Sequence, residues 1–371
     1  MAQPAELARR RMSSSPWRLW MQRALQLASL GAGRTSPNPL VGCVVLDAAG
    51  ALVGEGFHRQ AGTPHAEVHA LRQAGERAQG GTAIVTLEPC CHRGRTPPCS
   101  EALIAAGVSR VVVAMPDPDP RVAGGGIAQL QAAGIKVISG VCEDQAQTLN
   151  RSFIQRVQTG RPWGILKWAM SLDGRTALPN GSSQWISGSP ARAWVHQLRG
   201  QCDAVLVGGG TVRADNPLLT SRGQHSPEPL RVVLSRSLDL PSTAQLWDQN
   251  SASTLVLHGI DAPADQQHHL DRLGVEHLAL PDCGPKAAME LLAERGCNQV
   301  LWECGPELAA AALRDDCVQQ LAGVIAPKLL GGLAARTPLG DLGLVDVNQA
   351  EPWGQQRLRP LGDDWLIELQ R

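Results

Sequence analysis

The sequence predicts an α/β protein of two domains, and three observations support this. The chain has 371 residues, more than one typical hydrophobic core serves. Short apolar segments of strand length alternate with helical patterns along both halves. The stretch QRVQTGRPWG (155–164) precedes a new series of alternating elements. We therefore expect a disordered tail at 1–16, one domain at 17–158 and a second at 159–371.

The first half reads as a three-layer α/β domain. Ser15 is expected to cap a helix that starts at Pro16, runs through about Ser29 and ends near Gly31. Two strands joined at DAAG read as a hairpin. Proline at the start and glycine at the end of PPCSEALIAAG indicate a helix over 97–107. The expected elements are strands 41–46 and 51–57, helix 65–78, strand 82–89, helix 97–107, strand 109–115, helix 126–134 and strand 135–141.

The second half repeats the α/β alternation without visible similarity to the first. The triple glycine at 208–210 follows a strand and reads as a tight turn, while the motifs GxGxxG and GxxxxGK[ST] are absent. The expected elements are strand 164–174, helix 191–200, strand and turn 203–211, strands 230–237 and 253–259, and a strand, turn and helix over 298–316.

Composition narrows the function classes. The net charge is zero, from 34 basic and 34 acidic residues, so no basic excess points to nucleic acid. The absence of tyrosine excludes phenol chemistry. No apolar run reaches the ~18 residues of a membrane helix, and the N-terminus lacks the apolar core of a secretory signal. A true start at Met12 is an alternative to Met1. We expect a cytoplasmic protein with reduced cysteines, most of them small core residues.

One cluster of cysteines suggests a metal centre. The stretch LEPCCHRGRTPPC (87–99) holds three of the ten cysteines. His65, Cys90 and Cys99 lie at or near the starts of two predicted helices, and together they offer zinc one imidazole and two thiolates. The fourth tetrahedral position stays open, as in catalytic zinc sites, where water binds and its pKa falls toward ~7.

Glu67 follows His65 by two residues and suits a general base that later protonates a leaving amine. The pattern H-x-E with P-C-x-x-C is that of zinc nucleobase deaminases, but here eight residues separate Cys90 from Cys99. Two alternatives are a closed structural site with His92 as fourth ligand and an inert group of core residues. Cys91 is an alternative ligand, but adjacent residues on an extended chain point oppositely, so we do not expect Cys90 and Cys91 to bind one ion together.

These motifs resemble a known enzyme family. HAEVHAL, TLEPCCHRGRTPPC and SPNPLVGCVV resemble the deaminase domain of the bifunctional deaminase-reductases of riboflavin biosynthesis, in which the insertion ending in GRTPPC is typical. KWAMSLDGRTA, SSQWIS, HQLRGQCDAVLVGGGTVRADNPLLTSR and ECGPELA resemble its reductase domain. The resemblance covers about residues 17–371. It implies an N-terminal three-layer cytidine-deaminase-like domain plus a C-terminal dihydrofolate-reductase-like domain.

The resemblance implies two consecutive reactions on a pyrimidine ribosyl phosphate. The ring of 2,5-diamino-6-ribosylamino-pyrimidinone 5'-phosphate first loses an amine to water, and NADPH then reduces the ribosyl to the ribityl side chain. The zinc ligands would be His65, Cys90 and Cys99, with Glu67 as the proton shuttle. The pocket would be lined by Asn38, His58, His92 and Arg95. A turn residue (Asn38) and a solvated loop (His92, Arg95) are the alternative interpretations of three of these.

In the reductase half, the resemblance implies NADPH binding without a Rossmann motif. The GPELA turn opens a helix, whose free N–H groups suit a pyrophosphate. Arg199 and Arg222 could pair with the substrate phosphate, although Arg199 could equally be a helix C-terminal charge. The cofactor contacts would be Ala169, Trp185, Thr211, Asp215, Ser235 and Gly305, and the substrate contacts Ser183, Arg199, Leu219, Arg222 and Glu303.

Some functional questions stay open at this level. Either Lys167 or Asp173 could support proton transfer during reduction. An RNA-acting deaminase would need a basic surface and stacking aromatic groups, which the zero net charge disfavours. A non-enzymatic zinc scaffold would leave Glu67 without a role. We expect a small-molecule enzyme that binds neither nucleic acid nor membrane and forms a homo-oligomer.

Overall fold

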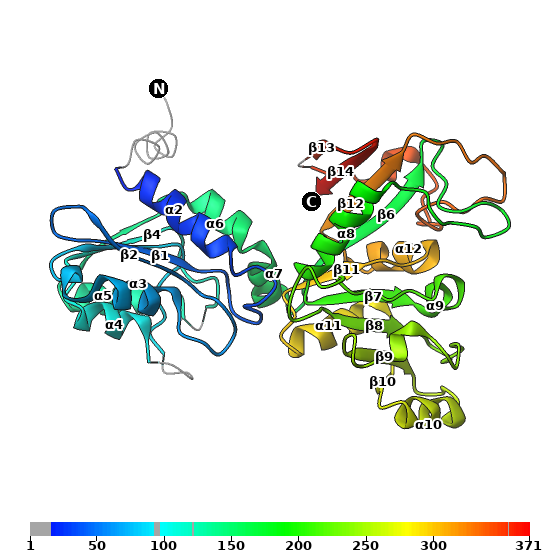
Figure 1. The fold of residues 1–371 in the computed structure, drawn as a ribbon, viewed down its shortest axis with the longest axis horizontal. Helices are drawn as coiled ribbons and strands as arrows, with labels where there is room; N and C mark the ends of the chain where they lie inside the picture. The colour runs from blue at the N-terminus through cyan, green and yellow to red at the C-terminus, as the bar shows by residue number, and fades with distance from the viewer. Residues whose placement is uncertain (1–15, 93–96, 121, 355) are drawn as a thin grey trace. The chain divides into compact units, whose positions relative to one another are not determined.

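The computed structural model describes residues 16–92, 97–120, 122–354 and 356–371, and the chain forms two compact units (Figure 1). The first extends to Thr159 and the second begins at Gly160. Among these described residues, no helix combines the length and the apolar character that crossing a bilayer would need. Each unit is an α/β sandwich around one sheet, as the alternation of elements predicts.

The first unit has a five-stranded sheet in the order β2-β1-β3-β4-β5. Strands β3, β4 and β5 are mutually parallel, whereas β1 is antiparallel to both β2 and β3. The carboxyl ends of β3 and β4 therefore lie at one edge, where loops can bring chemistry together. The strands are β1 (Gly42–Leu46), β2 (Leu52–Phe57), β3 (Thr82–Val85), β4 (Arg110–Val113) and β5 (Lys136–Ser139).

Helices cover both faces of this sheet. Helices α3, α4 and α5 pack on one face and α2 and α6 on the other, so two apolar cores form (Figure 1). The 3-10 helix Gly75–Ala78 extends α3, which ends earlier than the predicted 65–78 helix. The helices are α2 (Arg18–Ser29), α3 (Ala66–Ala74), α4 (Cys99–Ala105), α5 (Gly125–Ala132), α6 (Glu143–Leu149) and α7 (Arg151–Thr159).

Two glycines let α3 lie unusually close to β2. A Cβ at Gly54 would collide with the Ala70 carbonyl, and a Cβ at Gly56 would collide with the Ala66 carbonyl. The alternation Gly-Glu-Gly leaves this face of β2 without side chains. The start of α3, which carries His65 and Glu67, is thereby fixed against the sheet.

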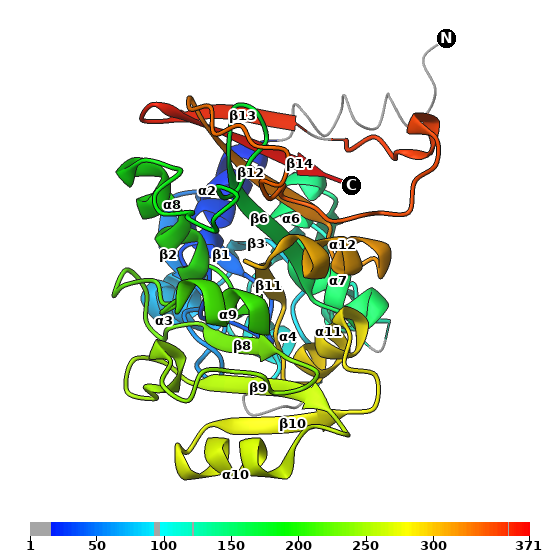
Figure 2. The same cartoon turned by 90° about the vertical axis from the view of Figure 1, so that its right-hand side faces the viewer.

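The second unit has a nine-stranded sheet in the order β10-β9-β8-β7-β11-β6-β12-β14-β13. Strands from β10 to β12 pair in parallel, and the antiparallel pair β14 and β13 forms the opposite edge from β10 (Figure 2). The strands are β6 (Trp163–Ser171), β7 (Ala204–Gly208), β8 (Leu230–Leu234), β9 (Thr254–Gly259), β10 (Glu276–Leu280), β11 (Gln299–Trp302), β12 (Gln320–Ala326), β13 (Gln356–Leu361) and β14 (Asp364–Gln370).

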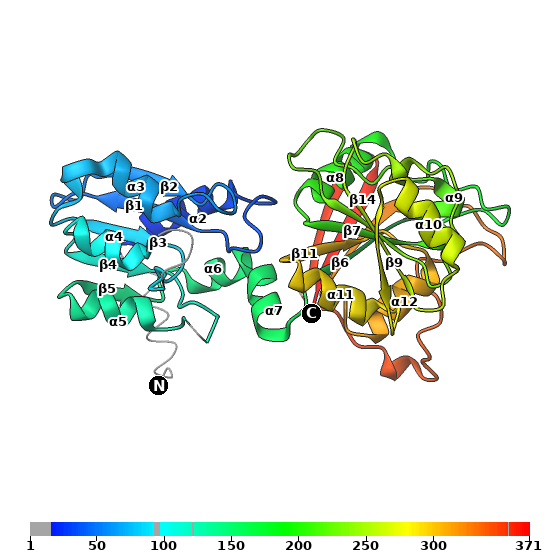
Figure 3. The same ribbon diagram turned by 90° about the horizontal axis from the view of Figure 1, so that it is seen from below.

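The helices of the second unit also form two layers. Figure 3 shows α8, α9 and α10 on one side of the sheet and α11 and α12 on the other, which matches the two apolar cores. Short 3-10 helices occupy Gln245–Trp247 and Val347–Gln349. The helices are α8 (Ser189–Gly200), α9 (Gly209–Asp215), α10 (Ala264–Arg272), α11 (Pro285–Glu294) and α12 (Pro306–Arg314).

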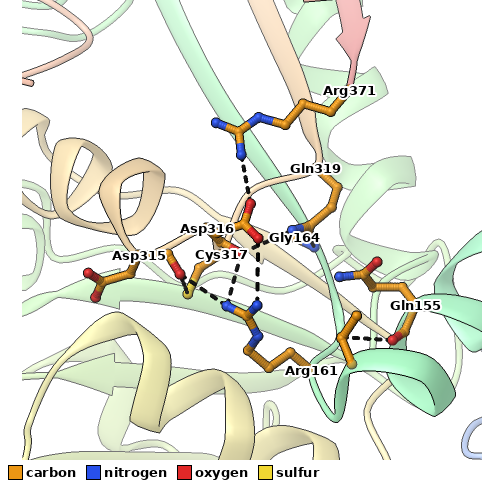
Figure 4. Close-up of polar contacts among 9 residues, drawn as sticks. Gln155, Arg161, Gly164, Asp315, Asp316, Cys317, Gln319 and Arg371 are labelled. Atoms are coloured by element: carbon orange, nitrogen blue, oxygen red, sulfur yellow. Dashed lines mark hydrogen bonds and ion pairs between the residues drawn. The ribbon is translucent and has the colours of Figure 1, made fainter. Parts of the chain in front are cut away.

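A polar cluster closes the end of this sheet where β6 begins (Figure 4). Arg161 donates to the carbonyls of Asp315 and Asp316, at 3.0 and 3.1 Å, and its guanidinium lies 3.6 Å from the Asp316 carboxylate. Arg371 reaches the same carboxylate at 2.6 Å. The turn between α12 and β12 is thus tied to the start of β6 and the end of β14.

Several expected boundaries are wrong, and the reasons are local. The expected strand 82–89 ends at Val85, because the following residues curve toward the site. The first helix begins at Arg18 rather than Pro16, and the proposed cap Ser15 lies outside the described residues. The expected tight turn at 208–210 is instead the start of α9.

Candidate functional site

Three candidate metal ligands converge in the first unit. His65 is the N-cap of α3, Cys99 is the first residue of α4, and Cys90 lies between β3 and α4. His65 Nδ1 lies 3.6 Å from Cys90 Sγ and 3.3 Å from Cys99 Sγ. The three ligand atoms lie within 4.8 Å of one another. Tetrahedral zinc, with bonds of about 2.0–2.3 Å, separates its N and S ligands by roughly 3.5 Å, so this donor set fits zinc.

The surroundings of the two thiols favour a thiolate. The backbone N–H of Cys99 donates to Cys90 Sγ at 3.4 Å. Hydrogen bonds from the Cys99 thiol and from His65 lower the pKa of Cys90 to about 4. The pKa of Cys99 is raised, because it keeps the proton that the two sulfurs share and is buried. Zinc binding would displace that proton.

Glu67 lies in the first turn of α3, beside these ligands, and its side chain is buried. Burial raises the pKa of the Glu67 carboxyl, and the negative charge of Cys90 adds to this effect. Its Oε2 atom has no hydrogen-bond partner among the described residues. A buried carboxyl oxygen without a partner is costly unless a ligand or water meets it. The Glu67 carboxyl is close enough to Cys90, His65 and Cys99 for all three to affect its pKa.

Cys91 and His92 take no part in this group of ligands within the described part of the chain. The Sγ of Cys91 packs on Gly125 at the start of α5, and His92 is exposed. A closed site with His92 as fourth ligand therefore lacks support. Arg95 lies outside the described residues.

Asn38 and His58 lie next to the candidate metal ligands. His58 Nδ1 lies 3.3 Å from the Pro64 carbonyl, which only accepts, so the hydrogen-bond network assigns the proton to Nδ1. His58 Nε2 then accepts from the Asn38 amide at 3.1 Å. The rings of His58 and His65 meet edge to face, with centroids 5.2 Å apart. Asn38 is thus more than a turn residue, since it extends a chain of contacts that reaches His65.

Glu88 is a buried carboxylate that sequence reasoning missed. It accepts from the backbone N–H groups of Asp117, Gly124 and Ile127, at 3.2, 3.0 and 3.0 Å. A Cβ at Gly126 would collide with the Pro89 carbonyl, so α5 packs directly on the segment that carries Cys90. Glu88 therefore holds the loop before α5 against the ligand segment. Its place within LEPCC was visible in the sequence, but its three backbone partners were not.

We expect Glu88→Gln to loosen this loop. In glutamine an NH2 group replaces one carboxylate oxygen, so at least one of the three buried N–H groups loses its acceptor. An unpaired buried N–H group costs about 2 kcal/mol. Hydrogen exchange followed by mass spectrometry should then be roughly 30-fold faster in peptides spanning 117–127. The exposed Glu76 offers a matched control, Glu76→Gln, that should leave exchange unchanged. Equal exchange in both variants would contradict this role.

The second unit contains a buried charge cluster. Glu303 follows β11 and receives a bidentate pair from Arg199, at 2.6 Å from Nε and 3.0 Å from Nη2. Lys167 Nζ, from β6, lies 3.9 Å from the same carboxylate. Burial alone would raise the pKa of Glu303, but the charges of Arg199 and Lys167 outweigh it and lower the pKa to about 2. Arg199 therefore forms its bidentate pair with Glu303, whereas the sequence suggested that it pairs with the substrate phosphate.

Residues expected to contact the cofactor gather at the carboxyl ends of parallel strands, where α/β sheets bind ligands. Gly209 packs against the Ser235 hydroxyl, and Gly305 approaches the hydroxyl of Thr211. Gly305 is the N-cap of α12, and Ala169 lies on β6. The structure thus brings the glycine-rich start of α9, the end of β8 and the start of α12 together.

Ser183, Trp185 and Asp215 form the more exposed part of this region. The Ser183 hydroxyl donates to Asp215 at 3.4 Å. Trp185 is 62% exposed, and the Arg192 guanidinium lies 4.8 Å from its ring centroid. An exposed indole at this position is available for stacking against a ligand.

Of the two candidate proton donors, the structure favours Lys167. Hydrogen bonds from Ser171 and from the N–H groups of Leu330 and Gly331 lower the pKa of Asp173 to about 2. Asp173 is therefore ionised at neutral pH and closes a turn. Burial lowers the pKa of Lys167, although Glu303 partly opposes the shift. The lowered pKa makes the Lys167 ammonium a better proton donor than an ordinary lysine.

Comparisons with known proteins agree with both halves. Residues 15–115 match the cytidine and deoxycytidylate deaminase zinc-binding region, and residues 162–367 match the RibD C-terminal domain. The riboflavin biosynthesis protein RibD of Synechocystis is 52% identical over 94% of each chain.

Two solved structures are also similar over nearly the whole chain. Acinetobacter baumannii RibD has a TM-score of 0.86 and 42% identity, covering 95% of this chain and 98% of that one. A Thermotoga maritima protein has a TM-score of 0.84 and 36% identity, with the same coverage. It is described as a diaminohydroxyphosphoribosylaminopyrimidine deaminase and 5-amino-6-(5-phosphoribosylamino)uracil reductase. With both halves matched and relatives aligned along their full length, the chain belongs to the RibD family of riboflavin biosynthesis proteins.

Proposed function

We propose that the chain removes an amine from 2,5-diamino-6-ribosylamino-pyrimidinone 5'-phosphate in its first unit and reduces the ribosyl group of the product in its second. As a member of the RibD family it is a bifunctional enzyme of riboflavin biosynthesis, a zinc-dependent deaminase and an NADPH-dependent reductase. The substrate and the residues that act on it are the proposal. The observation that carries it is the buried, unpartnered carboxyl oxygen of Glu67 beside His65, Cys90 and Cys99.

In the deaminase unit, His65, Cys90 and Cys99 would hold zinc, which when bound activates water for attack on the pyrimidine. Glu67 takes a proton from the attacking water and returns it to the departing amine. Asn38 and His58 would line the pocket for the ring, and His58 Nε2 would hold the Asn38 amide in position to meet it. His92 and Arg95, which follow the ligand segment, would bind the remainder of the substrate as polar donors.

In the reductase unit, NADPH when bound supplies a hydride. Thr211, Ser235 and the N–H groups after Gly305 would hold its phosphates and ribose, because they meet at the strand ends. Lys167 would supply the proton that completes the reduction. Ala169, Trp185 and Asp215 complete the proposed cofactor site, and Ser183, Arg199, Leu219, Arg222 and Glu303 the proposed substrate site.

Mass spectrometry of the substrate after incubation with zinc-loaded protein tests this function. Without NADPH, deamination should raise the mass by about one unit, because oxygen replaces the amine. With NADPH, the product should gain about two more units. The first gain alone would leave the proposed reductase step unsupported, and neither gain with stoichiometric zinc would contradict the proposal.

Asp215→Ala should weaken the use of NADPH and leave deamination intact. The substitution removes the acceptor of the Ser183 hydroxyl at the outer part of the proposed cofactor site. We expect the KM for NADPH to rise severalfold, since one hydrogen bond is worth about 1 kcal/mol. Steady-state kinetics checks this, with Asp261→Ala as an exposed control. An unchanged KM for NADPH would remove Asp215 from the site.

The location and assembly are further parts of the proposal. None of the ten cysteines, all within the described residues, forms a disulfide, and a site with two thiolate ligands works in a reducing compartment, so we propose a cytoplasmic protein. The homo-oligomer expected from the sequence stays a prediction, which sedimentation velocity at micromolar concentration would test.

A further inference from the structure

His196 is a polar side chain in the second unit to which no role is yet assigned. It lies on α8, three residues before Arg199, so the two side chains share one face of the helix. Its Nδ1 atom is buried and has no hydrogen-bond partner among the described residues. Nε2 is not enclosed in the same way, so it is the ring nitrogen that can meet a ligand.

The charges around His196 determine its protonation. Burial lowers the pKa of His196, and the positive charges of Arg199 and Arg222, and to a smaller extent Lys167, lower it further against the opposing effect of Glu303. The imidazole is therefore neutral at neutral pH. An unpaired buried N–H costs more than an unpaired lone pair with the same surroundings, so the proton belongs on Nε2. His196 thus offers one N–H donor within a group of cations.

Three of the five N–H donors of Arg199 are already used within the protein. Its Nε and Nη2 pair with Glu303, and its Nη1 donates to the Thr220 carbonyl at 3.1 Å. Both carboxylate oxygens of Glu303 are likewise occupied by Arg199. An anion that enters this site therefore needs further donors besides the two N–H groups that Arg199 has left.

The loop after Thr220 supplies a second donor near α8. Glu228 accepts from the backbone N–H and the hydroxyl of Ser221, at 2.5 and 2.8 Å, and from the Gly223 N–H at 3.1 Å. His225 packs against Gly200 at the end of α8, where a Cβ would be 2.5 Å from it. Arg222, between these anchors, has a left-handed backbone with φ of 56° and an exposed side chain. The loop that carries Arg222 therefore lies beside the end of α8, and Arg222 is close enough to His196 for its charge to lower the pKa of that imidazole.

From these contacts we propose that His196 binds the phosphate of the reductase substrate, donating from Nε2 alongside Arg222. The excess of positive charge around His196 favours an anion as the ligand. Arg199 and Glu303, which are paired with each other, lie next to this position. His196 would thus help the enzyme to distinguish the phosphorylated substrate from its dephosphorylated form. This inference rests on the proposed function, since it concerns how the same site recognises its substrate.

The test compares His196→Leu with the wild type on the deaminated substrate, with and without its phosphate. We expect the KM for the phosphorylated substrate to rise about tenfold, the loss of one hydrogen bond to a charged group, while kcat stays within about twofold. The KM values for NADPH and for the dephosphorylated substrate should not change. Inorganic phosphate should compete with the substrate about tenfold less well. Gln197→Leu, on the exposed side of the same helix, should behave like the wild type.

His196→Gln keeps an N–H donor, so it should bind inorganic phosphate with most of the wild-type affinity. This variant provides a second measurement if His196→Leu misfolds. An equal loss with both forms of the substrate, or an unchanged KM and unchanged inhibition by phosphate in a folded His196→Leu, would overturn the assignment of His196. A folded His196→Gln that recovers none of the affinity for inorganic phosphate would overturn the role of its N–H donor. A wild-type protein that reduces neither form of the substrate would instead contradict the proposed function.

Discussion

Glu67→Gln should lower the rate of deamination by about 10³-fold or more and leave the zinc content unchanged. The amide has the size of the carboxyl but cannot accept a proton from the attacking water, and general acid–base catalysis contributes about 10²–10⁴-fold. Glu67 is 3% exposed, so bulk water cannot readily take over its role. Deamination is measured by mass spectrometry and zinc by elemental analysis.

The controls separate chemistry from folding. Glu76→Gln changes the same functional group at an exposed position after α3 and should retain full activity. Reduction of supplied deaminated substrate by Glu67→Gln should match the wild type, because Glu67 belongs to the first unit. Deamination that persists at a tenth of the wild-type rate would show that another group carries the proton, and loss of zinc would mean that Glu67 supports the ligands instead.

The deaminase site was predictable because its chemistry is local in sequence. His65 and Glu67 are two residues apart at the start of one helix, and Cys90 and Cys99 lie within one loop and the next helix start. Residue type and spacing therefore suffice to propose a metal with an open position. The role of Glu88 could not be predicted from the sequence, because it depends on three N–H groups 29 to 39 residues further along the chain.

The reductase site was less predictable, since its contacts are distant in sequence. Arg199 and Glu303 are 104 residues apart, and nothing in the sequence shows that they bind each other. The pairing changes the interpretation of Arg199 from a free phosphate ligand to a residue held by a carboxylate. The strands and helices after residue 259 were mostly missed as well. Two of these strands, β10 and β13, are the edge strands of the sheet and have weak apolar patterns.

The same pair makes Glu303→Gln the variant with the largest expected effect on the second unit. The amide would leave Arg199 and Lys167 without their buried counter-charge, and breaking a buried pair in this way costs about 3–5 kcal/mol. Eight of the ten tryptophans lie after residue 160, so urea unfolding followed by tryptophan fluorescence reports mainly on this unit. We expect an earlier unfolding midpoint, a loss of reduction of more than 100-fold and unchanged deamination. Glu290→Gln, exposed on α11, should unfold like the wild type.

The pH dependence of stability provides a separate check on Glu303. Its pKa is lowered from 4.5 to about 2 in the folded chain, so the ionised carboxylate stabilises the fold above pH 4.5. That stabilisation, about 3.5 kcal/mol at 1.4 kcal/mol per pKa unit, should fade as the pH falls from about 4.5 toward 2. Glu303→Gln cannot titrate, so the difference in stability between wild type and variant should shrink over this interval. A difference that stays constant from pH 6 to pH 3 would show that packing, and not the charge of Glu303, accounts for the loss.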